Sequence, residues 1–344
     1  YQGHLKPVRC LAFHSDGTEL VSASWDLTIK KWSLATSPSV LDAHRHAIQD
    51  LDYSHDGKWL ATASVDKTIK LWQMPNRQLD YVFSDIQSPV RTVQFSPNGQ
   101  WLAAGTADGI LYVWDLQTRQ LKTKRLAHQK QINQVAFTSD SCTIGSVSND
   151  GHIKLWNLTS DQPVGDIEGH RGAINTISFS PDGSRFVTGG LDSTLRIWDR
   201  PQQHLLKEIP GNQQSILTAD WSPDGKWIAS SGYDRLIHVW DVNLGIKRDT
   251  LKGHKRPVTQ VRFSPDSQRI VSASYDFSLK LWDVIYGNQI FTLSGHRGVT
   301  WCAQFSPQGD WIASGSGDRQ IRLWDGRPAN TETTRLIPQA LSSR

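Results

Sequence analysis

The chain has 344 residues, with 37 basic and 33 acidic side chains and a formal net charge of +4. A balance this close to neutrality does not by itself indicate a nucleic-acid partner. The three cysteines are odd in number and lack metal-site spacing, which favours a reducing compartment over a disulfide framework, so we expect a cytoplasmic protein. Apolar runs stay well short of the ~18 residues that suggest a membrane span.

A tryptophan recurs at a nearly constant interval along the chain. The first step is 40 residues and each later step is 42, the positions being Trp32, Trp72, Trp114, Trp156, Trp198, Trp240, Trp282 and Trp324. A period of about 40 to 45 residues with a Trp-Asp pair is the mark of a β-propeller, in which each copy is a four-stranded sheet. Eight copies predict an all-β, eight-bladed propeller of four-stranded antiparallel blades, with the eighth blade packed directly on the first. We assign this ring to residues 1–325 and a tail to residues 326–344.

The elements of one copy follow one another in a fixed order, which the fifth copy illustrates. A weaker strand at 165–168 precedes Gly-His, and residues 173–179 then alternate apolar and polar side chains. Ser-Pro-Asp-Gly at 180–183 has turn chemistry, and further strands are predicted at 185–188 and 195–198. Helical periodicity is absent over any useful length, so the chain should be almost wholly β.

The compound motif Gly-His, Ser-Pro-Asp-Gly, Ser-x-x-x-Asp and Trp-Asp resembles the WD-repeat family, in its bacterial type, over nearly the whole chain. The resemblance implies a hydrogen-bonded tetrad of His, Ser or Thr, Asp and Trp in each blade. The matching positions are His4, Ser22, Asp26 and Trp32; His44, Thr62, Asp66 and Trp72; His128, Ser146, Asp150 and Trp156; His170, Thr188, Asp192 and Trp198; His254, Ser272, Asp276 and Trp282; and His296, Ser314, Asp318 and Trp324. Two copies depart: the third has Ile86 and Ala104 beside Asp108 and Trp114, and the sixth has Asn212 beside Ser230, Asp234 and Trp240.

Ring closure is expected to be unusual. In many members of the family the N-terminal segment supplies the outer strand of the last blade, but only Tyr1 and Gln2 precede the first Gly-His here. We therefore expect this latch to be missing and Thr333–Ile337, in the tail, to form the outer strand of the eighth blade.

Catalysis has no visible candidate. The His and Asp of each tetrad are 22 residues apart, but the pairs lie in separate copies and cannot converge on one ion or substrate. Phosphate-loop, zinc-protease and nucleophile-elbow motifs are absent, so no cofactor, metal ligand or catalytic residue is assigned. A propeller enzyme would need carboxylates or histidines that converge near the channel, and the predicted lining offers none. The additional Trp59, Trp101, Trp227 and Trp311 share one repeat position, which favours packing between blades.

The resemblance implies a non-catalytic protein-interaction scaffold or sensor that binds a peptide or partner domain on the narrow face of the ring. The chain begins with neither a signal peptide nor an initiator Met, so we expect it to be part of a longer polypeptide. The close similarity among its repeats resembles the propellers appended to large bacterial signalling proteins, which implies a signalling role and a partner that could be a domain of the same polypeptide. No membrane partner is expected. The alternatives are an enzyme with a channel-mouth site, or nucleic-acid or acidic-ligand binding through the basic loop residues Lys6, Arg45, Lys130, Arg171, Lys255, Arg256 and Arg297.

The family builds its narrow face from the residues three and five after the Gly-His histidine and the residue before the turn Asp. The protein-binding residues that we select from these positions are Arg9, Trp25, Arg91, Leu217, Tyr233, Tyr275, Val299 and Trp301. The second to fourth copies mostly carry amides there, such as Gln49, Gln131, Asn133 and Asn149. Because the sixth, seventh, eighth and first copies are neighbours in a closed ring, the aromatic side chains should gather on one side of the channel mouth.

Overall fold

The computed structural model describes residues 39–326, apart from residues 75 and 161, and three strands of the first repeat. These three are β1 (Val8–Phe13), β2 (Glu19–Ser24) and β3 (Ile29–Ser33). All regular elements in the described parts of the chain are β-strands. The described residues include no helix that is long and apolar enough to cross a membrane.

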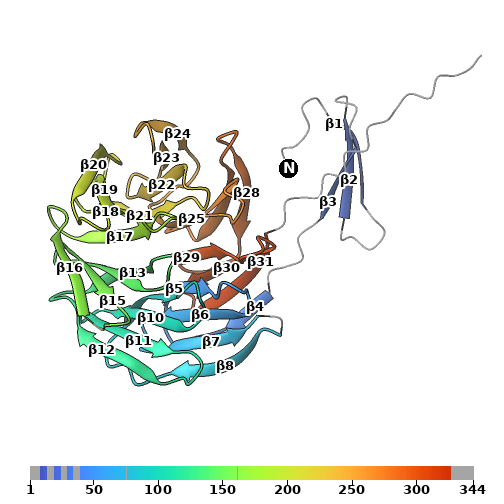
Figure 1. Ribbon diagram of the computed structural model, residues 1–344. Coiled ribbons are helices and arrows are strands. Elements are labelled where there is room, and N and C mark those ends of the chain that lie inside the picture. The colour runs from blue at the N-terminus through green and yellow to red at the C-terminus, as the bar shows by residue number, and fades with distance from the viewer. Residues whose placement is uncertain are drawn as a thin grey trace, which may run out of the picture.

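The second to eighth repeats form a ring of seven blades (Figure 1), each named here by the repeat that supplies its three inner strands. The first four blades contain β5 (Ile48–Tyr53), β6 (Trp59–Ser64), β7 (Ile69–Gln73) and β8 (Gln78–Phe83); β9 (Val90–Phe95), β10 (Trp101–Thr106), β11 (Ile110–Asp115) and β12 (Leu121–Leu126); β13 (Ile132–Phe137), β14 (Thr143–Ser148), β15 (His152–Asn157) and β16 (Gln162–Glu168); and β17 (Ile174–Phe179), β18 (Arg185–Gly190), β19 (Thr194–Asp199) and β20 (Leu205–Pro210). The other three contain β21 (Ile216–Trp221), β22 (Trp227–Gly232), β23 (Ile237–Asp241) and β24 (Lys247–Leu251); β25 (Val258–Phe263), β26 (Arg269–Ser274), β27 (Ser278–Asp283) and β28 (Gln289–Ser294); and β29 (Thr300–Phe305), β30 (Trp311–Ser316), β31 (Gln320–Asp325) and β4 (Ser39–Asp42).

The prediction of eight blades is therefore wrong. The ring closes between the second and eighth repeats, where Ile48 and Leu51 share one buried cluster with Cys302, Ile321 and Leu323. This shared core joins the two blades directly and leaves no place between them for another. The strands of the first repeat instead form a separate three-stranded sheet in the order β1-β2-β3 (Figure 1). The number of repeats in the sequence does not fix the number of blades in the ring, because each repeat specifies only the contacts with its neighbours.

The latch that we expected to be missing is present. It is β4, which pairs antiparallel with β31, so that Ser39 lies opposite Leu323 and Asp42 lies opposite Gln320. In the sequence this strand follows β3, but in space it completes the blade of the eighth repeat. The tail segment Thr333–Ile337, proposed for this edge from the sequence, lies outside the described residues.

The hydrophobic core lies between the blades rather than in one centre. Trp59 of the second-repeat blade packs against the cluster of the third, and Trp101 and Trp227 likewise pack against the clusters of the fourth and seventh. Each blade is thus incomplete without the next one, which is how a repeat structure buries its sheet faces. The predicted packing of these three tryptophans between blades is confirmed, whereas Trp311 is 38% exposed.

Candidate protein-binding face

The predicted tetrads are confirmed in the second, fourth, fifth, seventh and eighth repeats. In the fifth, His170 Nδ1 lies 2.9 Å from Asp192 Oδ1, and His170 Nε2 lies 2.8 Å from Thr188 Oγ1. Trp198 Nε1 donates to the same hydroxyl at 2.8 Å, so one hydroxyl joins the histidine to the third strand. The expected first tetrad, with His4 and Asp26, lies outside the described side chains.

The two departing repeats differ in how they replace the tetrad. In the sixth, Asn212 bonds both Asp234 and Ser230, and His238 supplies an additional contact, its Nε2 lying 3.0 Å from Asp234 Oδ2. This repeat therefore keeps a polar network with a different donor. In the third, the positions of His and Ser are taken by apolar side chains, and Trp114 stacks on Tyr112 at 5.4 Å between ring centroids.

Each tetrad also fixes a loop of the narrow face. The carboxylate of the tetrad Asp accepts the N–H of the residue after the histidine, as in Arg171 to Asp192 at 3.1 Å and Lys255 to Asp276 at 3.0 Å. Burial of Asp192 opposes its ionisation, but hydrogen bonds from His170 and Thr194 outweigh burial and hold its pKa below the usual value. Burial lowers the pKa of His170, which keeps the imidazole neutral near pH 7.

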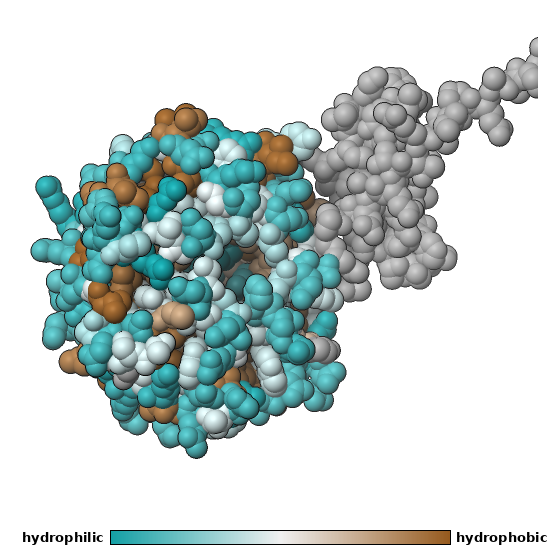
Figure 2. Space-filling model, viewed as in Figure 1, coloured by the Kyte–Doolittle hydropathy of each residue, from teal (hydrophilic) through white to brown (hydrophobic). Residues whose placement is uncertain are grey.

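Most of the described residues that were predicted to form the narrow-face site lie together in the structure. Arg91, Leu217, Tyr233, Tyr275 and Trp301 line one cavity of about 280 Å³ at the channel mouth. Figure 2 shows the surface of the ring hollowed at its centre. Val299 is partly buried nearby in the chain but is not part of this lining. Arg9 and Trp25 lie outside the described side chains.

The cavity has an aromatic side and an amide side. Tyr275 and Trp301 meet edge to face, with ring centroids 5.2 Å apart, and Tyr233 beside them is 46% exposed. Across the mouth, Asn133 Nδ2 donates to Asn149 Oδ1 at 2.7 Å and to the Ile174 carbonyl at 2.8 Å. The amides are therefore held in place by the blades, and the aromatic residues of the sixth to eighth repeats lie together in the same cavity. The first repeat, which was expected to add Trp25 to this group, is not a blade of the ring.

Arg91 joins the two sides. Its guanidinium donates to Gln49 Oε1 at 2.5 Å, and the phenol of Tyr275 and the carboxyl of Asp50 lie close to it. Burial lowers the pKa of this arginine, although a guanidinium stays protonated at any physiological pH. A partly buried cation beside two aromatic rings suits a carboxylate that brings an apolar group with it.

The channel lining was missed by the sequence analysis. Directly below the cavity, a side chain on the inner strand of one blade accepts the N–H of the residue 43 positions later, on the inner strand of the next blade. Ten such bonds are present among the described residues. Six of them, at 2.8 to 3.3 Å, have acceptors spaced 42 residues apart from Asp50 onward and make up what we call the inter-blade row; the acceptors and donor amides are Asp50 and Val93, Thr92 and Val135, Gln134 and Ile177, Thr176 and Ala219, Thr218 and Val261, and Gln260 and Ala303. A polar residue at every forty-second position, within an otherwise apolar strand, is the signal that could have predicted it.

Three carboxylates lie in this lining, contrary to the expectation that the channel offers none. Asp50, Asp52 and Asp220 are all close to Arg262, which lies 3.7 Å from Asp220. Burial raises the pKa of all three carboxyls, that of Asp52 to about 7. Asp52 accepts the Phe95 N–H at 2.7 Å, so its role in the fold is to join blades. Among the described residues, no group of three or more His, Cys, Asp or Glu could hold a metal ion.

The described basic loop residues come from five of the seven blades of the ring. The described ones are exposed and lie just after the histidine position of their repeats: Arg45, Lys130, Arg171, Lys255, Arg256 and Arg297. Lys6 lies outside the described residues. This rim gives the narrow face exposed positive charge around the aromatic and amide cavity.

Comparison with known protein families agrees with this architecture. The family model described as WD domain, G-beta repeat matches residues 1–33, 35–73, 78–115, 119–157, 161–199, 203–241, 245–283 and 287–325. No curated protein matched the chain. Seven of the matched repeats begin with the strand that precedes a Gly-His position, so residues 35–325 contain every strand of the closed ring. Since the matches cover almost the entire chain, the chain belongs to the WD40 repeat family.

Proposed function

We propose that this chain is a non-catalytic protein-interaction module of a larger cytoplasmic signalling protein, and that it binds an acidic peptide or partner domain on the narrow face. The observation that carries the proposal is the cavity in which the part-buried rings of Tyr275 and Trp301 meet beside Arg91. WD40 propellers generally bind proteins, and clustered aromatic residues beside an arginine are the usual composition of an interaction hot spot.

The chemistry of the cavity defines the partner. An apolar or aromatic anchor would fill the space beside Tyr233 and Tyr275, and a carboxylate next to it would reach Arg91. The exposed cations of the rim, such as Lys255 and Arg297, would attract further acidic groups on either side of the anchor. The fixed amides of Asn133 and Asn149 would hydrogen-bond the backbone of the partner.

The test is selection of a random peptide library on the immobilised chain, followed by affinity measurement of the enriched peptides. Tyr275→Ala with Trp301→Ala should weaken their binding at least tenfold, because the apolar anchor loses its contact surface. The matched control is Tyr286→Ala, which removes a side chain that is 81% exposed at the opposite end of the same blade. Equal binding by the double variant and the control would place the site elsewhere.

The basic rim supports a second candidate, an acidic ligand such as nucleic acid. The six described cations are exposed, but they are spread over loops of five blades. Binding of an oligonucleotide that falls steeply with salt, and that survives Tyr275→Ala with Trp301→Ala, would favour this candidate over the first.

A further inference from the structure

The turns that lead from the third strand to the outer strand carry exposed apolar residues in two neighbouring blades. In the sixth-repeat blade they are Leu244 and Ile246, between β23 and β24, and in the seventh-repeat blade they are Ile285 and Tyr286, between β27 and β28. These four side chains, which we call the apolar tips, are between 57% and 81% exposed. Figure 2 shows hydrophobic surface at the top of the ring, over β24 and β28.

The apolar tips depart from the other repeats. At the position of Leu244 and Tyr286, the second to fifth repeats carry Asn76, Thr118, Ser160 and Gln202. At the position of Ile246, they carry Gln78, Gln120, Gln162 and His204. The turn is therefore polar in four other blades, so closing the turn does not require the apolar residues.

The N–H groups of the tips are hydrogen-bonded within their own turns. Asp241 Oδ1 accepts the Leu244 N–H at 2.8 Å. Asp283 Oδ1 accepts the N–H groups of Ile285 and Tyr286 at 2.8 and 2.9 Å. These bonds fix the backbone of both turns and hold the apolar side chains outward.

Two carbonyl groups of the tips are hydrogen-bonded to the preceding blade. Lys207 Nζ, from β20, donates to the Leu244 carbonyl at 2.9 Å, and Arg248 Nη2, from β24, donates to the Ile285 carbonyl at 3.2 Å. A backbone polar group that enters an apolar environment without a partner costs free energy. Because these groups have partners in the chain itself, the tips can leave water without losing those hydrogen bonds.

The exposed side chains beside the tips have a positive net charge. Lys247 and Arg248 follow the tip of the sixth-repeat blade directly and are exposed. Asp224 is also exposed, but it is paired with Lys226 at 3.4 Å. The other carboxylates of this region are partly buried and accept backbone N–H groups; they are Asp241, Asp249 and Asp283. An anionic surface would therefore be attracted to this edge of the ring.

The tips lie at the end of the ring opposite the narrow face. In the sixth-repeat blade, β23 begins just after Asp234, which bonds the narrow-face loop, and ends just before Leu244. Leu244 and Tyr286 are 42 residues apart and hold the same position in neighbouring blades, so they project from one level of the ring. Convex apolar residues at one level fit a flat apolar layer.

We propose that the apolar tips, with Lys247 and Arg248, bind the surface of a membrane that contains anionic lipids, and that the tips insert among the lipid chains. Burial of the apolar side chains and attraction of the two cations to anionic headgroups both favour this contact. No membrane partner is expected from the apolar runs of the sequence, but binding at a bilayer surface requires exposed tips rather than a spanning segment. The narrow face then points away from the membrane and stays open to a protein partner.

Vesicle co-sedimentation of the full chain tests this contact, with vesicles of phosphatidylcholine mixed with phosphatidylserine and vesicles of phosphatidylcholine alone. Binding to the mixed vesicles should be the stronger of the two. Leu244→Gln with Tyr286→Gln places at both tips the residue that the fifth repeat carries there, and should lower the partition coefficient onto mixed vesicles at least about tenfold. The matched control, Leu126→Gln with Leu191→Gln, removes apolar side chains of similar exposure from other blades and should leave the coefficient unchanged.

The proposal is overturned if the chain does not bind the mixed vesicles, or if the tip variant binds them as well as the control variant does. Binding that survives in the tip variant and disappears at high salt would overturn it in favour of the basic rim. A dimer in light scattering that the tip variant converts to a monomer, without vesicle binding, would overturn it in favour of contact with a second copy of the chain.

A fluorescent label measures insertion independently. Leu244→Cys, in a chain whose native cysteines are replaced by serine, carries the environment-sensitive dye nitrobenzoxadiazole. Mixed vesicles should shift the emission of this dye to the blue, because the dye enters the lipid, whereas the same dye on Leu126→Cys should show no shift. An unchanged spectrum at Leu244 would overturn insertion of the tips.

Discussion

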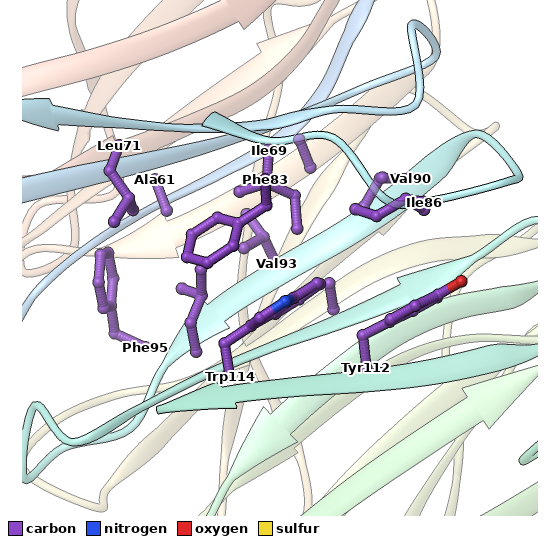
Figure 3. Close-up of a cluster of buried hydrophobic side chains, with 13 residues drawn as sticks. Ala61, Ile69, Leu71, Phe83, Ile86, Val90, Val93, Phe95, Tyr112 and Trp114 are labelled. Carbon is purple, nitrogen blue, oxygen red and sulfur yellow. The ribbon is translucent and has the colours of Figure 1, made fainter. Parts of the chain in front are cut away.

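The blades of the fifth and third repeats stabilise the same turns by opposite means. In the fifth, His170, Thr188 and Asp192 form a buried polar network, and Arg196 bonds the Gly169 carbonyl and Glu208. In the third, the corresponding positions of the histidine, the hydroxyl and the arginine are Ile86, Ala104 and Tyr112. Figure 3 shows Tyr112 and Trp114 lying side by side in the cluster that includes Ile86.

The difference shows that the histidine and the hydroxyl of the tetrad are replaced together in the third repeat, which keeps Asp108 and Trp114. Tyr112 is 2% exposed and Ile86 is 3% exposed, so both fill space that polar side chains use elsewhere. A buried polar network is stable only when each member has a partner, and removing one member alone leaves the others unsatisfied. Three coordinated changes avoid that penalty by replacing hydrogen bonds with apolar burial.

The largest effect expected from this comparison is that of Tyr112→Ala. It should lower the free energy of unfolding by about 3–5 kcal/mol, because a large buried ring is replaced by a cavity next to Trp114. Arg196→Ala, at the same position of the fifth repeat, is the matched control and should cost about 1 kcal/mol. Urea unfolding followed by tryptophan fluorescence measures both, and equal costs would show that the third repeat does not depend on this ring.

Asp192→Ala should cost roughly 1–3 kcal/mol, since it leaves the imidazole of His170 and the Arg171 and Thr194 amides without their acceptor. The same urea titration reads this change. A cost near zero would mean that water replaces the carboxylate and that the polar network contributes little.

Acid should weaken the fifth-repeat blade more than the third. Burial lowers the pKa of His170, so the unfolded chain takes up a proton first as pH falls below about 6.5. The neutral histidine therefore makes its full contribution to the free energy of unfolding above that pH, and this contribution is lost below it. The loss between pH 7 and pH 5 should be no more than about 2 kcal/mol.

Hydrogen exchange resolved by blade checks this difference. Amides of β18 and β19 should lose protection at pH 5, after correction for the intrinsic exchange rate, while those of β10 and β11 change less. Equal losses of amide protection in both blades would contradict the expectation that acid weakens the fifth-repeat blade more than the third.

The smallest effect is expected from Asp108→Ala. This Asp is exposed and accepts a hydrogen bond from Thr106 at 2.6 Å, but its repeat has neither the histidine nor the tetrad hydroxyl. We expect a loss below about 0.5 kcal/mol in the same urea titration. A loss as large as that of Asp192→Ala would reveal partners of Asp108 that the blade comparison overlooks.

The local features of this molecule could be predicted from its sequence. Strand positions, tetrads and the grouping of Tyr233, Tyr275 and Trp301 at the channel mouth follow from residue chemistry repeated at a fixed period. Each of these features lies within one repeat or between neighbours, so the period alone places it. Even the departure of the third repeat is visible as Ile86 and Ala104, although the compensating Tyr112 was not recognised.

Closure could not be predicted in the same way. A segment such as β4 can pair with the third strand before it or with the last blade of the ring, because both edges have the same backbone pattern. The choice depends on how many blades complete the circle, which no single repeat encodes. The channel carboxylates were missed for a related reason: Asp50 and Asp52 look like solvent-facing residues of a strand until the inner strands converge.

The junction where β29 meets β5 sets a limit on the pH range of the ring. At the position of the inter-blade row in the eighth repeat, the residue is Cys302. At this junction Gln260 Nε2, from the seventh repeat, donates to Asp50 Oδ1 at 3.3 Å. Asp52 lies on the same strand, and burial raises its pKa to about 7. The contribution of its protonated carboxyl to the free energy of unfolding is therefore complete at low pH and is lost as pH rises through about 7. The tetrads change in the opposite sense, losing stability as pH falls. Acidification from neutral pH therefore weakens the tetrads, whereas it strengthens the contribution of Asp52, which grows as pH falls from about 7 to about 4.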